Sequence, residues 1–300
     1  MAVTIESVST QAWAGIANSD NLNITKPTGT ADGDLLVAHI ASSLDAVDNH
    51  VVSTPAGWTL LFEQEVGASA NSGCMTIFYK VASSEGASYN FTNASGRMLL
   101  MAGAIYRISS AVSAGIQYAV DADETADATP VFTNTVTPSA ANSLLLFLTN
   151  AVGTEGGSTS ASGYEIITSN PAWTEQYDIA GDGDATFGGG SDGDGFMAGA
   201  SALRPETSAT GNSTVTFSAA WAKSIGAIIV IPPIVNAIVN PAVVTMTLSC
   251  PAPVITGSAS VSPGVVIITL SVQSPSVTVP TPEWSNEDKS SASYVNEEKS

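Results

Sequence analysis

Two stretches of this 300-residue chain decide its fold: residues 33–41 read GDLLVAHIA, and residues 142–150 read NSLLLFLTN. Each is an apolar run next to a turn-forming residue, and few windows of the chain show the 3.6-residue periodicity of a helix. Elsewhere, Gly, Pro, Asn, Asp and Ser recur about every 8 to 12 residues between β-branched or aromatic runs, a spacing typical of all-β domains. We therefore predict an all-β protein.

The apolar runs define the expected strands. In the first part of the chain they span residues 34–41, 58–66, 75–82, 88–92 and 98–108. In the second part they span residues 143–151, 173–179, 196–203, 213–217 and 225–231.

The same order of segments occurs twice, which indicates an internal repeat. TPAGWTLLFE (54–63) corresponds to SNPAWTEQYD (169–178), and LLMAGAIYRI (99–108) corresponds to SIGAIIVIPP (224–233). A unit of four or five strands cannot cover its own apolar face, so two such units are expected to pack together. We predict one pseudo-duplicated antiparallel β-sandwich, jelly-roll-like, over residues 1–232, with halves of about 1–120 and 121–232.

A second, shorter repeat follows the predicted sandwich. PAVVTMTLSCPAPVITG (241–257) aligns with PGVVIITLSVQSPSVTV (263–279), and both are apolar segments bounded by prolines. Residues 233–280 are thus expected to form short tandem strands. These strands would pack against the sandwich or associate with neighbouring copies as a stalk. Their unpaired edges favour the second arrangement and a homo-oligomer, for which a trimer is the leading hypothesis.

The composition excludes some partners. Eight Lys and Arg residues stand against 27 Asp and Glu, for a net charge of −19. Such a chain repels phosphate backbones, so we expect no nucleic-acid binding. The most apolar stretch, residues 225–244, is interrupted by Pro232, Pro233 and Pro241 and is rich in Ile and Val, which favours strands over a membrane helix. The first residues, MAVTIESVSTQAWAG, do not have the pattern of a signal peptide.

Candidate chemistry is sparse. His39 lies in an apolar strand and His50 in a polar loop, and neither has a nucleophile at a recognisable spacing, so we predict no enzyme activity. Cys74 and Cys250 are expected to be two buried thiols, and Trp58 and Trp173 to be core residues. Four aspartates in a glycine-rich segment are the weak candidates for calcium, although their spacing favours a solvated connection: Asp182, Asp184, Asp192 and Asp194.

The chain closes on WSNEDKSSASYVNEEKS (284–300), in which an aromatic residue, Asn, two acidic residues and Lys-Ser occur twice. So short a phrase cannot compensate the ordering of its own backbone, roughly 1 to 2 kcal/mol per residue, and should be disordered in isolation. A solubilising acidic tail is one interpretation. The repeated register favours a docking tail over residues 281–300, whose expected contact residues are Trp284, Asn286, Lys289, Tyr294, Asn296 and Lys299.

Several segments resemble a β-sandwich module of structural and appendage proteins of tailed bacteriophages and of some bacterial surface proteins. They are ITKPTGTADGDLLVAHIA (24–41), TPAGWTLLFEQEV (54–66), MTIFYKVASSEGASYNFT (75–92) and AGAIYRI (102–108). The resemblance implies a non-catalytic virion component without cofactors, displayed as a fibre, head decoration or tail appendage and folded in the bacterial host cytoplasm. Its partners would be other virion proteins. The alternative is a carbohydrate-binding module of a bacterial cell-surface protein, with a surface glycan as ligand.

Overall fold

A computed structural model describes residues 3–44, 50–67, 72–96, 99–153, 160–166, 171–181 and 194–234. These residues form fifteen β-strands in several antiparallel sheets and contain no helix, which confirms the predicted all-β class. No helix in this part of the chain is therefore long and apolar enough to cross a membrane. The described residues belong to one compact unit, Met1–Val239. Apart from Pro233 and Ile234, the predicted strand repeats over residues 233–280 lie outside the described residues, and so does the docking tail over residues 281–300.

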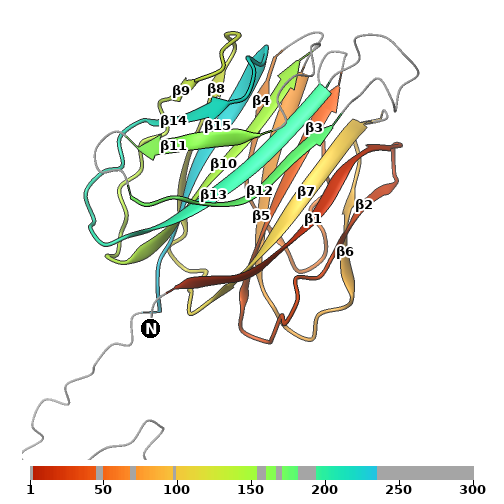
Figure 1. Cartoon of the computed structure of the whole chain (residues 1–300). Helices are drawn as coiled ribbons and strands as arrows, with labels where there is room; N and C mark the ends of the chain where they lie inside the picture. The colour runs from red at the N-terminus through yellow and green to blue at the C-terminus, as the bar shows by residue number, and fades with distance from the viewer. Residues whose placement is uncertain are drawn as a thin grey trace, which may run out of the picture. The chain divides into compact units, whose positions relative to one another are not determined.

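Two five-stranded sheets form the centre of the molecule (Figure 1). The first sheet has the order β1 (Thr4–Ile16), β7 (Leu99–Ser109), β3 (Leu35–Leu44), β5 (Ser72–Val81) and β4 (Thr59–Val66). The second sheet has the order β12 (Thr174–Gly181), β13 (Asp194–Arg204), β10 (Ser143–Gly153), β15 (Lys223–Ile231) and β8 (Gln117–Asp123).

Two smaller sheets accompany them. One consists of β2 (Asn21–Thr25) and β6 (Ser88–Thr92), and the other of β11 (Ala161–Ile166), β14 (Ser213–Phe217) and β9 (Val131–Phe132). The chain passes from the first large sheet to the second between Ser109 and Gln117. This crossing comes shortly before residue 120, where the sequence places the midpoint of the repeat.

Three hydrophobic clusters join the four sheets. The first lies between the two large sheets and includes Leu35, Val37, Met75, Ile77 and Tyr106 with Leu146, Leu148, Met197 and Ile229. The second joins the second large sheet to the three-stranded sheet and includes Phe132, Phe147, Phe196 and Val215. The third joins the first large sheet to β2 and β6 and includes Leu22, Ile24, Phe78 and Phe91.

Burial on both faces explains the apolar runs that define the central strands. Successive side chains of a strand point to opposite faces. All eleven residues of β10 are buried, because one face contacts the first large sheet and the other face contacts the three-stranded sheet. The strand therefore reads as a continuous apolar run and not as an alternating pattern.

Both ends of the described chain lie at one end of the molecule. Thr4 at the start of β1 pairs with Ser109, and the Ile234 amide donates to the carbonyl of Ser110 at 2.9 Å. The opposite end is where β3 meets β5 at Leu44 and Ser72, and where β10 meets β13 at Gly153 and Asp194. The central strands of the two large sheets thus run lengthwise between these two ends (Figure 1).

Candidate functional site

Most predicted site residues lie outside the described part of the chain. This applies to all six docking-tail residues, Trp284, Asn286, Lys289, Tyr294, Asn296 and Lys299, and to Asp182, Asp184 and Asp192 of the acidic segment. Asp194 is the first residue of β13, and Gly181 pairs with Gly195, so the acidic segment connects the two strands of a hairpin. Within the described ranges, no group of three or more His, Cys, Asp or Glu residues could hold a metal ion.

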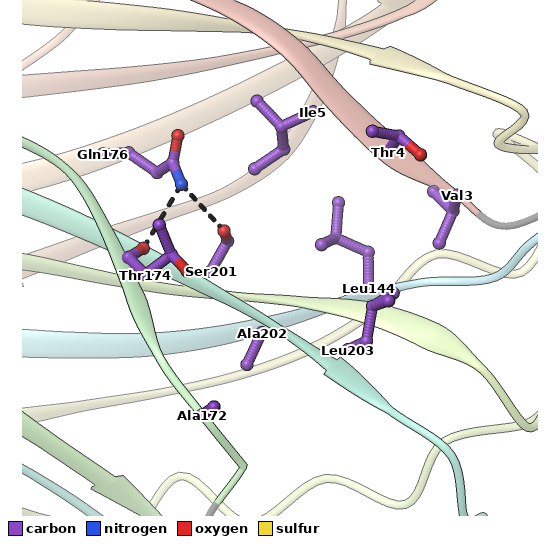
Figure 2. A pocket seen from close by; sticks show the side chains of 10 residues that line it. All are labelled: Val3, Thr4, Ile5, Leu144, Ala172, Thr174, Gln176, Ser201, Ala202 and Leu203. Carbon is purple, nitrogen blue, oxygen red and sulfur yellow. Dashed lines mark hydrogen bonds between the residues drawn. The ribbon is translucent and has the colours of Figure 1, made fainter.

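A hollow of about 430 Å³ lies along the seam where β1 of the first large sheet faces β12 of the second (Figure 2). We call it the seam hollow. The start of the chain forms one side, and the ends of β10, β12 and β13 form the other. Its lining residues are Val3, Thr4, Ile5, Leu144, Ala172, Thr174, Gln176, Ser201, Ala202 and Leu203.

The lining of the seam hollow is aliphatic or polar, without an ionisable side chain. Gln176 lies at a register irregularity of β12, and its Nε2 donates to Ser201 Oγ at 2.9 Å and to the Thr174 carbonyl at 3.2 Å (Figure 2). Leu203 remains half-exposed. The side chains that line the hollow thus offer hydroxyl, amide and aliphatic groups.

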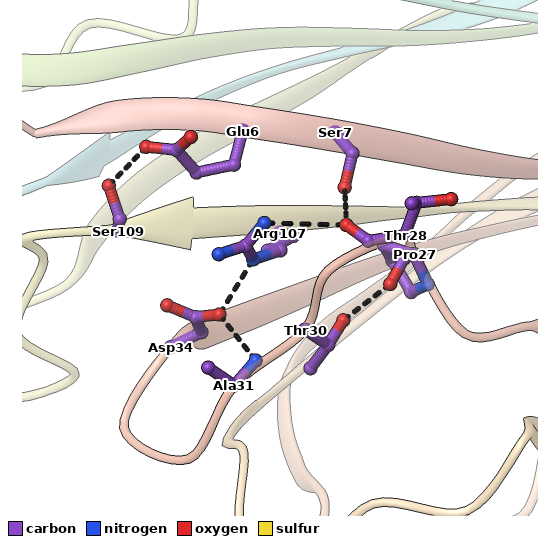
Figure 3. A network of polar contacts seen from close by, with 9 residues as sticks. All are labelled: Glu6, Ser7, Pro27, Thr28, Thr30, Ala31, Asp34, Arg107 and Ser109. Atoms are coloured by element: carbon purple, nitrogen blue, oxygen red, sulfur yellow. Dashed lines mark hydrogen bonds and ion pairs between the residues drawn. The ribbon is translucent and has the colours of Figure 1, made fainter.

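A polar network next to the hollow fixes the start of β1 (Figure 3). Arg107 of β7 forms an ion pair with Asp34 at 2.7 Å and donates to the Thr28 carbonyl at 3.3 Å. Ser7 donates to the same carbonyl at 2.9 Å, and Ser109 donates to Glu6 at 2.6 Å. These contacts tie β1, β7 and the segment before β3 together, so one wall of the hollow is held in place.

His39 of the first large sheet forms polar contacts with two strands of the second. Its Nδ1 lies 2.6 Å from the Tyr177 hydroxyl, and its Nε2 lies 2.7 Å from Asn150 Oδ1. Asn150 Nδ2 in turn donates to the Cys74 carbonyl at 2.8 Å. Burial lowers the pKa of His39 to about 3, although the hydrogen bond with Asn150 opposes that shift. His39 is therefore neutral at physiological pH.

His50 is also buried. Its two ring nitrogens each lie 2.9 Å from a serine hydroxyl, Nδ1 from Ser42 and Nε2 from Ser72. Ser42 and Ser72 are themselves almost inaccessible, so this arrangement contributes to packing where β3 ends and β5 begins.

The predicted packing roles hold for several side chains. Cys74 is a buried free thiol whose pKa is raised, chiefly by burial, so it is unreactive as a nucleophile. Cys250 lies outside the described residues. Trp58 packs edge-on against Tyr89 and Phe91 in the third hydrophobic cluster, and Trp173 packs against the second cluster.

Comparisons with protein-family models, with curated proteins and with solved structures found no match. The seam hollow and the His39 contacts, which the sequence did not predict, join residues far apart in the chain. The one signal available in the sequence was a histidine within an apolar strand, which indicates burial. It does not identify the partner Tyr177, which is 138 residues away in the chain.

Proposed function

We propose that the two large sheets and their smaller companions are two copies of one fold, packed face to face as a duplicated β-sandwich. The strand orders support this proposal. The first large sheet, read from β1, is β1-β7-β3-β5-β4, and the second, read from β8, is β8-β15-β10-β13-β12. The two orders coincide when each strand is matched with the strand in the corresponding position of the repeat.

Two matched glycines give further support. Gly103 and Gly226 begin the sequence Gly-Ala-Ile in β7 and β15. A Cβ atom on Gly103 would come within 2.5 Å of Ile24 of β2, and one on Gly226 would collide with Phe132 of β9. Each glycine thus makes room for a side chain of a smaller sheet. The turns before β3 and β10 also match, because Gly33 and Asn142 both have a positive φ, 92° and 57°.

We propose further that the protein is a non-catalytic structural component of a tailed-bacteriophage particle, attached through its C-terminal region. One observation carries this proposal: Thr4, where β1 begins, and Ile234, the last described residue, lie at the same end of the molecule. A body joined to a particle by residues beyond Ile234 would present its opposite end outward. The resemblance to phage appendage modules and the repeated phrase in residues 284–300 agree with display of this kind.

The carbohydrate-binding alternative gains less support from the described surface. Sugar-binding sandwiches use exposed aromatic rings as stacking platforms. Tyr118 has the most exposed aromatic side chain of the described residues, at 43%, and its ring already stacks on Phe62 with centroids 4.7 Å apart. Trp58 is buried against Tyr89 and Phe91.

Particle incorporation tests the proposed function. A chain ending at residue 280 should fold but be absent from purified particles, because it lacks both copies of the aromatic-Asn phrase. The double variant Trp284→Ala and Tyr294→Ala should behave in the same way. The matched control, Ser291→Ala and Ser293→Ala between the two copies, should be incorporated normally. Immunoblotting of purified particles measures the outcome, and undiminished incorporation of the truncated chain would contradict attachment through the tail.

A further inference from the structure

The contacts of His39 form one continuous chain that crosses three times between the large sheets. Tyr177 of β12 contacts His39 of β3, His39 contacts Asn150 of β10, and Asn150 contacts the Cys74 carbonyl of β5. Strands β3 and β5 belong to the first sheet, and β10 and β12 to the second. The side chains of His39, Tyr177 and Asn150 are all buried, so water does not substitute for these bonds.

The carbonyl of Cys74 fixes the direction of every hydrogen bond in the chain. Asn150 Nδ2 donates to that carbonyl, so Asn150 Oδ1 faces His39 and accepts from Nε2–H. A neutral imidazole with its proton on Nε2 has a free lone pair on Nδ1, which accepts from the Tyr177 hydroxyl. The neutral tautomer of His39 therefore satisfies each polar atom at these contacts without placing a charge in the core.

The groups that face His39 offer no compensation for a positive charge. Tyr177 of β12 and Tyr106 of β7, with ring centroids 5.8 Å apart, are the titratable side chains on the inner faces around it, and burial raises the pKa of both. The Cys74 thiol lies on the other face of β5, 3.7 Å from Thr76. Asp178 points away from Tyr177 and accepts from the Ala161 amide. A charge on His39 would be buried without a counter-ion.

We propose that the Tyr177–His39–Asn150 chain is an acid-sensitive latch that holds the two large sheets together. A proton from solvent binds Nδ1 of His39 and gives it a second N–H, so the Tyr177 hydroxyl must accept from Nδ1 and turn its own proton away from His39. The same step places an uncompensated charge in the hydrophobic cluster between the sheets. The latch is thus closed at neutral pH and opens in acid.

The direction of the pH effect follows from proton binding. His39 has a pKa of about 3 in the folded protein, below the usual value of 6.5 that it regains on unfolding. Between these values the unfolded chain binds the extra proton, so its contribution to stability is complete above about pH 6.5 and falls as the pH falls. Asp178 acts in the opposite direction, because burial raises the pKa of its carboxyl to about 6. The experiment must therefore isolate His39.

Nuclear magnetic resonance of the wild-type chain gives the direct test, because the sequence contains two histidines. With ¹⁵N-labelled histidine, one imidazole should remain neutral with its proton on Nε2 at pH 5, and Tyr177→Phe should shift its Nδ1 resonance. A His39 resonance that titrates near pH 6.5, or one with its proton on Nδ1, would overturn the proposal.

Chemical unfolding at several pH values tests the effect on stability. His39→Gln is the matched variant, because its side-chain amide donates and accepts but does not titrate. Between pH 6 and 4 the folding equilibrium constant of the wild type should fall by about tenfold per pH unit more than that of the variant. The same difference should appear in a His50→Gln background, which excludes a contribution from the titration of the other histidine. If the stability of the wild type and of His39→Gln depends equally on pH, the latch is overturned. If the variant does not fold, the histidine spectra of the wild type decide.

Discussion

Trp13 closes the seam between the two large sheets. Its indole Nε1 donates to the Ile179 carbonyl at 2.9 Å, and its ring covers Gly181 and Gly195 on the facing strands. A Cβ atom on Gly195 would come within 2.5 Å of the ring. The two glycines are thus needed because the indole approaches the backbone of β12 and β13 too closely for any side chain.

Gly195→Ala should destabilise the protein by roughly 1 to 3 kcal/mol, because the Trp13 ring must shift out of a packed position. Urea unfolding followed by tryptophan fluorescence measures this loss. Gly86→Ala is the matched control, since the nearest atom to its added Cβ lies 4.0 Å away, and it should change stability by no more than about 0.5 kcal/mol. Equal midpoints for the two variants would contradict this account of Trp13.

Individual contacts of this kind could not be predicted from the sequence. The apolar neighbours of His39 indicated that it would be buried, but the identity of its partners depends on how β3 faces β10 and β12. The seam hollow likewise requires that β1 and β12 form the edges of two different sheets. Such juxtapositions are set by packing between segments more than 100 residues apart.

Strands with two covered faces were the predictable part of the fold. The expected strands at residues 98–108 and 225–231 agree closely with β7 and β15, because both faces of each are buried and the apolar run is continuous. The sequence analysis missed β1, β2, β8, β9 and β11. In β1 the pairing register shifts after Ile5 and after Gln11, and these shifts break the alternating pattern. Strand β9 contains two residues, which is too short for a pattern to show.

Each large sheet depends on the other for one of its faces. The inner face of the first sheet, which includes Val37, Ile77 and Tyr106, is covered by side chains of the second. A chain of residues 1–113 should therefore be insoluble or lack cooperative unfolding, whereas residues 1–234 should fold. Circular dichroism during thermal unfolding distinguishes the two. A soluble N-terminal half with a cooperative transition would show that the halves are independent domains.

The charge of the whole chain opposes self-association through the described surface. Most Lys and Arg side chains of the described residues already form ion pairs with carboxylates. Lys80 pairs with Glu85 and Arg107 with Asp34, both at 2.7 Å. Copies with a net charge of −19 repel one another. By contrast, the sequence between Lys223 and Glu283 contains no charged residue, so association through that region would bring no like charges into direct contact.

We expect the full chain to be a homo-oligomer in solution, with a trimer as the leading hypothesis, and residues 1–234 to be monomeric. Light scattering coupled to size-exclusion chromatography at physiological salt gives both masses. The truncated chain keeps the Ile234–Ser110 hydrogen bond and so provides a folded control. A monomeric full chain, or an oligomer that survives the truncation, would contradict assembly through the C-terminal region.

The position of the last described strand has a mechanical consequence. Strand β15 leads to Ile234 and is hydrogen-bonded on both sides, to β10 along one edge and to β8 along the other. A force applied at Ile234 would act along this strand, so the two ladders would have to shear together and could not open one bond at a time. Resistance to forced unfolding is governed by the unfolding rate. The strand on which tension from an attachment would act first is therefore hydrogen-bonded along both of its edges.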